Sequence, residues 1–306
     1  MRLGVLGSGS AGNSVLVESG ETRILVDAGF SARELARRLE SMDRSPESIS
    51  AIVITHDHGD HTRGMGVFAR RFGTPIYITE PTRIACSRLL RGDERVEHYR
   101  PGYPVTVGDL RVEPFITVHD AVDPVAVAVV ETATELRLGI ATDLGRPTAQ
   151  VRHALARSDF LILEANHDEA MLHSSPYPHA VRRRIASSHG HLSNHAAASF
   201  AEELLHPRLT GVLLAHLSRE CNTPELAMEV VGTRLRAAGF VGLVAVAGQD
   251  EPSRFLDVEE LRGRTGPPQL TLLEPPALLP SPSGGPSGQN PRSEPEQPHE
   301  VVGQRP

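Results

Sequence analysis

The amino-acid sequence predicts an α/β protein, a four-layer αββα sandwich in which two β-sheets face each other and helices cover their outer sides. Short apolar runs rich in β-branched residues recur along most of the chain, as strands require. Hairpin-like strands come first, and strand–helix alternation follows. This order favours two facing sheets with helices outside.

The predicted strands are short and lie at residues 3–6, 14–17, 23–26, 51–54, 76–79, 105–107, 110–114, 125–130, 137–141, 160–163, 211–214 and 243–246. Two of the intervening helices have clear ends. Ser31 and Glu34 form a capping-box pattern at the start of the first helix. Thr223 and Pro224 open a later helix, which Gly239 should close.

A single domain is expected over residues 1–261, followed by a disordered tail over residues 265–306. The chain has 306 residues, of which 39% are hydrophobic, enough for one large core. From residue 265 on, Pro, Gly, Ser, Gln and Glu dominate, and 11 of the 24 prolines fall in the tail. The sequence of the tail shows no regular spacing of apolar residues.

The composition predicts a cytoplasmic protein without a membrane span. The N-terminus, Met-Arg-Leu before a glycine loop, shows no secretory leader, so Cys86 and Cys221 are expected to be reduced thiols. No apolar run reaches the roughly 18 residues of a membrane helix. The formal net charge of −7 disfavours a broadly basic nucleic-acid surface, although it counts carboxylates that bound cations would neutralise.

Residues 55–61 read Thr-His-Asp-His-Gly-Asp-His and carry the most informative pattern in the chain. The string directly follows an apolar run, so it begins where a strand ends. On an extended segment His56 and His58 can point the same way and share one ion. A bend at the glycine then turns Asp60 and His61 toward a neighbouring ion. One short loop could therefore serve two metals.

Three later polar residues each end an apolar run, where a loop can aim the side chain into a shared cleft. They are His119, Asp143 and His216. Taken singly, each would more often be a turn or capping residue. Together with the histidine-rich string they indicate a binuclear metal site, because a second ion needs ligands beyond those of one loop.

These motifs resemble the ordered motifs of metallo-β-lactamase-fold hydrolases, over residues 1 to about 250. The resemblance implies two divalent metal ions, with His56, His58 and His119 on one, Asp60, His61 and His216 on the other, and Asp143 bridging them. It also implies that Asp27, at the end of an apolar run, is the carboxylate that fixes a ligand imidazole. Zinc and manganese both suit such ligands, so the identity of the ions stays open.

Four further segments are similar to the YycJ/WalJ group of this superfamily, which is associated with exonuclease activity on DNA from the 5′ end. They are the glycine loop at 6–14 and the segments at 163–167, 190–194 and 216–224. The resemblance implies a phosphodiesterase acting as a 5′-to-3′ DNA exonuclease, with a hydroxide shared by the ions as nucleophile. The residues alone leave DNA versus RNA and the end preference open.

Several residues are candidates for roles beyond metal binding. His191 is similar in its Gly-His-Leu-Ser setting to an element of RNase Z enzymes, so it is expected to stabilise the reacting phosphate or protonate the leaving oxygen. Asp60 is expected to orient the attacking hydroxide. Ser218, Arg219 and Asn222 are candidates for binding a terminal 5′-phosphate.

The sequence also bears on how the substrate is held. A nucleic-acid-gripping arm of the RNase Z kind would sit between His119 and Asp143, which are only 24 residues apart. Substrate is therefore expected to be held mainly by loops near the metals. The arginines at 182–184 are by default a solvated helix face, and contact with a phosphate backbone is the functional alternative.

Two other functions are compatible with parts of this pattern. A small-molecule hydrolase acting on a thioester, lactam or cyclic phosphodiester could use the same metal shell. A protein with redox iron is disfavoured, because no flavodoxin-like domain is present to deliver electrons. The expected partner is a nucleic acid, DNA above all, and no obligatory protein partner is inferred.

Overall fold

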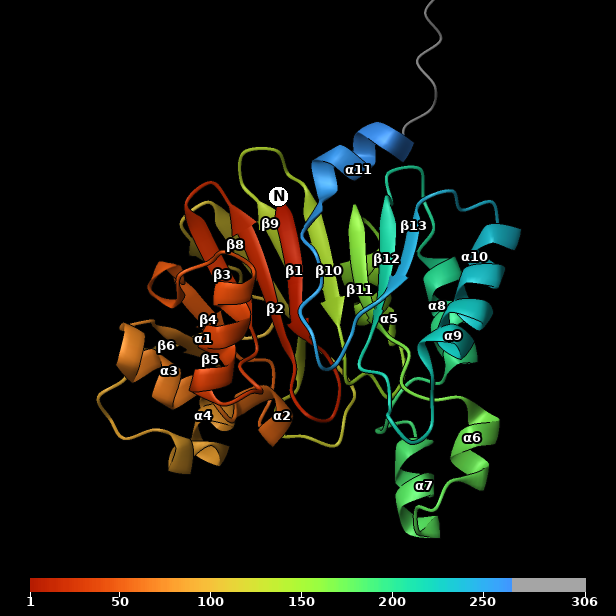
Figure 1. Ribbon diagram of the computed structural model, residues 1–306, viewed down its shortest axis with the longest axis horizontal. Helices are drawn as coiled ribbons and strands as arrows, with labels where there is room; N and C mark the ends of the chain where they lie inside the picture. Colours follow the sequence, from red (N-terminus) through yellow and green to blue (C-terminus); the bar gives the residue numbers. More distant parts are fainter. Residues whose placement is uncertain (266–306) are drawn as a thin grey trace, which may run out of the picture. The chain divides into compact units, whose positions relative to one another are not determined.

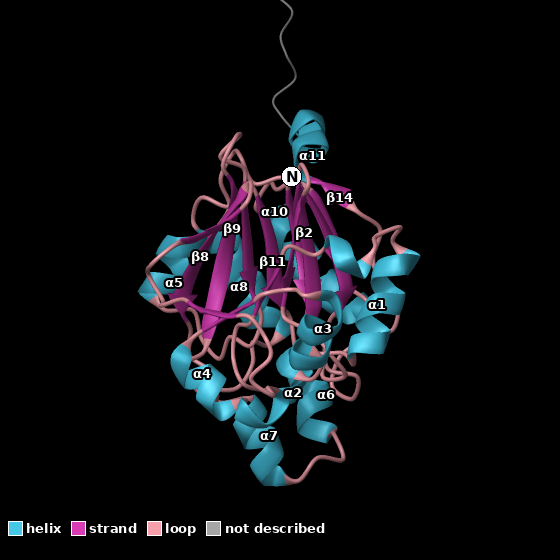
Figure 2. Ribbon diagram, turned by 90° about the vertical axis from the view of Figure 1, so that its left-hand side faces the viewer, coloured by secondary structure: helices cyan, strands magenta, loops and turns pink. Residues whose placement is uncertain are grey.

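The computed structural model describes residues 1–265, and the prediction of a tail from residue 265 therefore lies almost wholly outside the described residues. Two seven-stranded sheets face each other, and helices cover their outer sides (Figure 1). The four-layer αββα sandwich predicted from the sequence is confirmed. A second view, turned by 90°, shows the same layers with the long strands running from top to bottom (Figure 2).

The first sheet has the strand order β14-β1-β2-β3-β4-β5-β6. Its strands are β1 (Arg2–Gly7), β2 (Ser14–Ser19), β3 (Thr22–Val26), β4 (Ala51–Val53), β5 (Ile76–Ile78), β6 (Val96–His98) and β14 (Leu256–Asp257). Strands β14, β1, β2 and β3 pair antiparallel, whereas β3 to β6 are parallel.

The second sheet has the order β13-β12-β11-β10-β9-β8-β7. Its strands are β7 (Val105–Val107), β8 (Leu110–Ile116), β9 (Val125–Glu131), β10 (Arg137–Ala141), β11 (Phe160–Glu164), β12 (Gly211–Ala215) and β13 (Leu243–Val246). Strands β7 to β10 pair antiparallel and β10 to β13 are parallel. Each sheet thus joins hairpins to a parallel half.

Helices α1 (Ala32–Ser41) and α3 (Met65–Phe72) cover the first sheet, and α2 (Gly59–Thr62) and α4 (Glu80–Ala85) lie toward its lower end in Figure 1. The second sheet is covered by α5 (Ala149–Leu155), α8 (Asn194–Glu203), α9 (Pro224–Ala227) and α10 (Thr233–Ala237). Helices α6 (Glu169–Ser174) and α7 (His179–Ile185) project below the sandwich, and α11 (Val258–Thr265) lies at the opposite end. Single turns η1 (Pro46–Ser48), η2 (Ser87–Leu89) and η3 (Met228–Gly232) complete the helical segments.

Alternating side chains along the strands fill three buried layers. Ile24 faces the other sheet, whereas the next residue, Leu25, packs under the outer helices. In the second sheet Ile162 faces inward, and its neighbours Leu161 and Leu163 pack against the helices on the other side. This period of two is what a strand buried on both faces requires.

The two predicted helix starts are confirmed. Ser31 Oγ accepts a hydrogen bond from the Glu34 amide, but the Glu34 carboxylate binds Arg37 and Arg38 instead of closing a capping box. Thr223 caps α9, and the helical segment ends before Gly239, which has φ +85°. The π-helical turn η3 inside that segment was not predicted. Strands β6 and β14 were also missed, because they are two or three residues long and mostly half-buried, without a clear apolar run.

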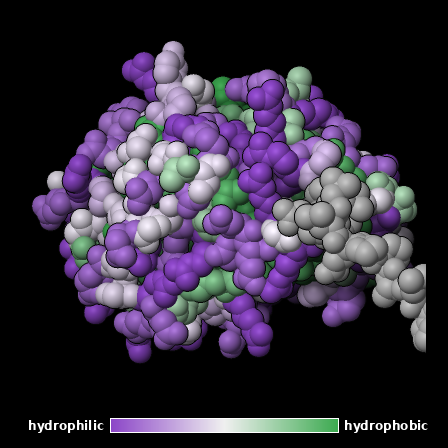
Figure 3. All heavy atoms as spheres, turned by 90° about the horizontal axis from the view of Figure 1, so that it is seen from above, coloured by the Kyte–Doolittle hydropathy of each residue, from purple (hydrophilic) through white to green (hydrophobic). Residues whose placement is uncertain are grey.

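The two ends of the sandwich carry different elements. Seen from the end that carries α11, the visible side chains are mostly hydrophilic (Figure 3). The parallel strands of both sheets end at the other edge, where α2, α6 and α7 lie. None of the helices in residues 1–265 has both the length and the hydrophobicity needed to cross a membrane.

The layer between the sheets is expected to dominate the stability of the fold. Ile162→Ala leaves a cavity there, so we predict a loss of about 2–5 kcal/mol in the free energy of unfolding, measured in urea. Val241→Ala is the control, since Val241 is 81% exposed, and it should change the value by less than about 0.5 kcal/mol. Equal stability of the two variants would contradict this description of the core.

Candidate metal centre

All the predicted metal ligands lie at one edge of the sandwich. His56, His58, Asp60 and His61 follow β4 in the first sheet. In the second sheet His119 follows β8, Asp143 follows β10 and His216 follows β12. The two sheets therefore contribute opposite walls of one site. Their roles as ligands stay predictions, but the structure brings all seven side chains together.

Three of the strand-end residues adopt an uncommon backbone conformation. Asp27, Asp143 and His216 have φ values of 66°, 57° and 56°, in the left-handed region that residues other than glycine seldom occupy. Each ends a parallel strand, and the left-handed turn redirects the side chain from the sheet toward the shared edge. Such conformations are retained where the surrounding contacts hold them, which is common at functional sites.

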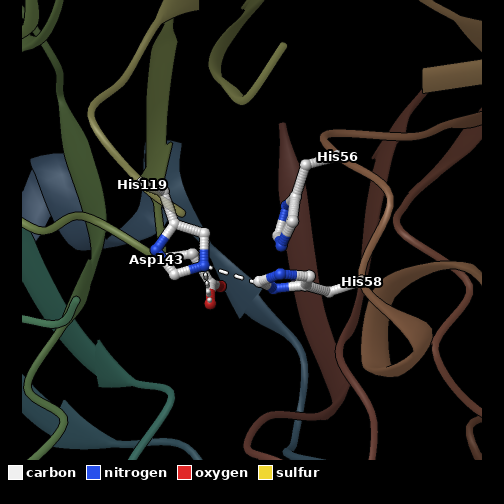
Figure 4. A group of neighbouring side chains, drawn as sticks. All are labelled: His56, His58, His119 and Asp143. Atoms are coloured by element: carbon white, nitrogen blue, oxygen red, sulfur yellow. Dashed lines mark hydrogen bonds and ion pairs between the residues drawn. The ribbon is translucent and has the colours of Figure 1, made fainter. Parts of the chain in front are cut away.

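One group of potential ligands consists of His56, His58, His119 and Asp143 (Figure 4). One ligand atom from each lies within 4.8 Å of the others. His58 Nδ1 and His119 Nε2 are 3.3 Å apart, and the ring centroids of His56 and His58 are 4.8 Å apart. Figure 4 shows the imidazoles approaching from opposite sides, with the Asp143 carboxylate beside them.

A second group consists of Asp60, His61 and His216. Asp60 Oδ2 lies 3.4 Å from His216 Nε2 and 3.6 Å from His61 Nε2. Asp143 lies between the groups: its Oδ2 is 3.0 Å from His61 Nε2 and its Oδ1 is 3.5 Å from His119 Nε2. Apart from Asp143, the two groups correspond to the division of ligands that the sequence resemblance implied, which stays a prediction. A third group of potential ligands, Asp143, Glu164, His191 and His216, shares one residue with each of them.

The Nδ1 atoms of four of these imidazoles face hydrogen-bond acceptors outside the cluster. The partners are Thr55 Oγ1 for His56 at 2.9 Å, Asp27 Oδ2 for His61 at 2.7 Å, the Gly190 carbonyl for His119 at 3.1 Å and Glu164 Oε1 for His216 at 3.1 Å. When Nδ1 carries the hydrogen, the neutral ring presents an Nε2 lone pair. All four lone pairs then face the cluster, as metal ligation requires.

Two polar atoms of the cluster lack a hydrogen bond among residues 1–265, although one of them, Asp143 Oδ2, lies within ion-pair distance of His61 Nε2. His56 Nε2 and Asp143 Oδ2 are buried and form no hydrogen bond among the described residues. Unsatisfied buried polar atoms are costly, and lone pairs that face one another repel. A divalent cation accepts electron pairs from several such atoms at once. The donor set of imidazoles and carboxylates therefore fits divalent metal ions.

Burial and mutual proximity shift the pKa values of the site. Burial lowers the pKa of His56 well below its usual range and also lowers that of His119. For His216, burial opposes protonation, but Asp143 outweighs it and raises the pKa to about 10. Burial would raise the pKa of Asp143, but His216 and His61 hold it well below its usual range. The carboxylate is thus charged and surrounded by imidazoles.

Glu164 contacts two histidines of the site, although no role there was predicted for it from its sequence position. Its Oε1 lies 2.7 Å from His191 Nδ1 and 3.1 Å from His216 Nδ1, and its Oε2 accepts the backbone amides of Leu144 and Leu192. Burial opposes its charge, but His191 and the other contacts lower its pKa to about 2. The signal was present, because Glu164 ends the apolar run at 160–163 just as the predicted ligands end theirs.

The glycine loop between β1 and β2 supports the second group. Asn13 Nδ2 lies 3.2 Å from Asp60 Oδ2 and 3.1 Å from His61 Nε2. Ser8 donates its hydroxyl to Asn13 Oδ1 and accepts the His216 amide. Gly29, which follows β3, packs closely against the same segment, since a Cβ atom on it would lie 1.6 Å from the Asp60 carbonyl oxygen. Sequence reasoning gave the loop no such role, because loops of this composition often only make turns.

His191 adjoins the cluster, with its side chain 18% exposed. Burial lowers and Glu164 raises its pKa, and the net direction is upward. Of the predicted phosphate-binding residues, Arg219 is exposed and binds Gln249 and Asp250. Ser218 is buried, with its Oγ accepting the Cys221 amide.

Asn222 is the one candidate whose surroundings oppose its predicted role. It is buried, and its amide group bonds with Asn194, with the Ala165 carbonyl and with the Thr223 amide. Both amide hydrogens are used, so none is left for a phosphate. Asn222 instead ties together the segments that carry Glu164 and His191.

The family model of the beta-lactamase superfamily domain matches residues 22–213. The chain therefore belongs to the beta-lactamase superfamily. The solved structure of the metallo-β-lactamase fold protein YhfI from Bacillus subtilis supports the fold, with a TM-score of 0.64 over 83% of this chain and 99% of that chain at 19% identity.

Two relatives place the chain more narrowly. Exodeoxyribonuclease WalJ of Streptococcus pneumoniae is 36% identical over 238 residues, which cover 76% of this chain and 88% of the relative. Exodeoxyribonuclease YycJ of Bacillus anthracis is 33% identical over 242 residues, which cover 78% of this chain and 91% of the relative. The resemblance to the YycJ/WalJ group that the sequence motifs indicated is confirmed.

Asp27 is expected to act on metal binding through His61. Its carboxylate accepts the Thr55 amide and hydroxyl as well as His61 Nδ1, so an amide in its place loses the charge that orients the ring. We predict that Asp27→Asn weakens Mn²⁺ or Zn²⁺ binding about 10–100-fold in calorimetric titration. Asp93→Asn, at an exposed loop position, is the control. Unchanged metal affinity in the Asp27 variant would contradict the role of Asp27 in orienting His61.

Proposed function

We propose that this protein is a metal-dependent 5′-to-3′ DNA exonuclease that works in the cytoplasm. The observation that carries the proposal is the cluster of seven side chains from both sheets, with Asp143 between its two ligand groups. The chain shares 36% and 33% sequence identity with exodeoxyribonucleases WalJ and YycJ over most of its length, which supports DNA as substrate. Two free buried cysteines fit a reducing compartment.

Two divalent ions, zinc or manganese, would be held by His56, His58 and His119 on one side and by Asp60, His61 and His216 on the other, with Asp143 shared. When bound, such a pair supplies Lewis acidity that ionises water near neutral pH and neutralises charge on a phosphate. The remaining chemistry falls to side chains of the protein. The metal ligands alone do not determine which substrate is hydrolysed. Substrate specificity must therefore come from the residues around the metal site.

Asp60 would orient the attacking water. Its carboxylate is half-exposed and is held by Asn13 Nδ2, so one face is fixed and the other remains free to accept a hydrogen from water. Burial opposes its charge, but His216 and His61 lower the pKa of Asp60, which keeps it an acceptor. Asp60 would thus act as ligand and as orienting group.

His191 would assist the departing 3′ oxygen. Its Nδ1 is held by Glu164, which leaves Nε2 as the free end of the ring. Against the effect of burial, Glu164 raises the pKa of His191, which favours the ring with a proton on both nitrogens, and this form can donate from Nε2 to an oxygen that gains negative charge. Ser218 and Arg219 are the remaining candidates for a terminal 5′-phosphate, with Arg219 having to leave Asp250 to bind it.

Replacing His191 separates catalysis from metal binding. His191→Ala should lower kcat on a DNA substrate about 10²–10⁴-fold while leaving the metal content unchanged, because it removes only the proton donor. Mass spectrometry of the bound metal and a gel assay provide the two readouts. His195→Ala is the matched control, since the His195 side chain is 68% exposed. Loss of metal from the His191 variant would show that it is a ligand instead.

The substrate can be tested with three nucleic acids in the presence of Mn²⁺ or Zn²⁺. A 5′-phosphorylated linear duplex should be degraded, whereas a covalently closed circle and single-stranded RNA should persist. His58→Ala should abolish degradation and keep the fold, because His58 is half-exposed and lies in a loop. Cleavage of the closed circle, or turnover of a thioester with no nucleic acid degraded, would contradict the proposal.

A further inference from the structure

Helices α6 and α7 form an exposed extension, residues 168–190, which we call the arm. It is inserted between β11 and α8 and projects beyond the sandwich on the same side as α2, as both ribbon views show (Figures 1 and 2). No residue of α7 is buried, and Leu172 is the only buried residue of α6. A seven-residue helix without a buried face gains little stability from packing. Its surface is therefore free for a partner.

The arm is positively charged within an acidic protein. Residues 168–190 contain Arg182, Arg183 and Arg184 with two acidic residues, whereas the whole chain has a formal charge of −7. Successive helix positions point about 100° apart, so the three arginines face different ways. Arg182 binds the His173 carbonyl in α6, and Arg184 binds Asp120 next to the metal centre. Arg183 is exposed and has no partner among residues 1–265.

Arg146 adds a second free cation at the base of the arm. It lies three residues after Asp143, is exposed, and forms no hydrogen bond or ion pair within the described part of the chain. The preceding residue, Gly145, packs against the arm so closely that a Cβ atom on it would lie 2.3 Å from the Ser188 carbonyl oxygen. Arg146 is thus next to both the metal centre and the arm.

The base of the arm is bonded directly to residues of the site. The His191 amide donates to the Ile185 carbonyl at 2.9 Å, and the Asp120 amide donates to the His189 carbonyl at 2.9 Å. The Gly190 carbonyl faces His119 Nδ1 at 3.1 Å. The arm is therefore held in a fixed place beside the position where a scissile phosphate would lie.

We propose that the arm, together with Arg146, binds the phosphate backbone of the nucleic-acid strand that extends from the metal centre. This inference rests on the proposed function and names a surface for that substrate. A nucleic acid carries a negative charge at every nucleotide, so a cationic surface beside the cleavage site matches the strand that leaves it. Arg146 and Arg183 are the binding residues, because no acidic side chain of the described residues neutralises them.

The proposed surface adds to the loops near the metals, which the sequence predicts to hold the substrate. The gap between His119 and Asp143 is indeed too short for an arm, but the segment between β11 and α8 supplies one. A contact of this kind adds affinity for long substrates and leaves the chemistry at the metal centre unchanged. Substrate length is therefore the variable that reveals it.

The test compares Arg146→Glu/Arg183→Glu with the wild type on two substrates, a 5′-phosphorylated 30-nucleotide duplex and bis(p-nitrophenyl) phosphate. We expect KM for the duplex to rise about tenfold. The slope of log(kcat/KM) against log salt concentration should become shallower by about 1 per arginine. Activity on the small diester should not change. Fluorescence anisotropy of the labelled duplex in EDTA should show the same loss of affinity without catalysis.

Arg157→Glu is the matched control. Arg157 is exposed and unpaired among residues 1–265, and it precedes β11, at the end of the strand opposite Glu164. An unchanged KM for the duplex in the double variant, or an equal rise in the Arg157 variant, would refute the arm as the binding surface. Failure of the wild type to hydrolyse either substrate would instead refute the proposed function, and this inference with it.

Discussion

The buried carboxylate of Asp143 is the constraint on which the rest of the site depends. It lies 3.0 Å from His61 Nε2, 3.5 Å from His119 Nε2 and 3.6 Å from His216 Nε2, so it touches both ligand groups. A charge in such a place is stable only if cations or protons surround it. Its left-handed backbone and the short connection after β10 fix it there. Divalent ions would neutralise the Asp143 carboxylate and accept the lone pairs of the surrounding imidazoles.

This constraint explains why the site needs the whole sandwich. The loop after β4 comes from the first sheet, whereas His119, Asp143 and His216 come from the second. The apolar layer between the sheets therefore sets the distance between the two walls. Outside the cluster, Asp27 and Glu164 hold the imidazoles of His61 and His216 from opposite sheets. Stability of the core and geometry of the site are thus linked.

The sequence predicted the sandwich and the ligand candidates because both rest on local patterns. Apolar runs mark strands, and the polar residues that end them mark the edge where strands meet. Glu164 ends such a run but was missed as a site residue, since its partners are far away in the sequence. The role of Asn13 was hidden for the same reason. Asn222 looked available in the sequence, and only the folded chain shows its amide occupied.

Anomalous X-ray scattering from crystals grown with Mn²⁺ tests the central claim most directly. The account predicts two peaks, one contacted by His56, His58 and His119 and the other by Asp60, His61 and His216, with the Asp143 carboxylate reaching both. Peaks confined to other parts of the molecule, or no peak in crystals of an active preparation, would contradict it.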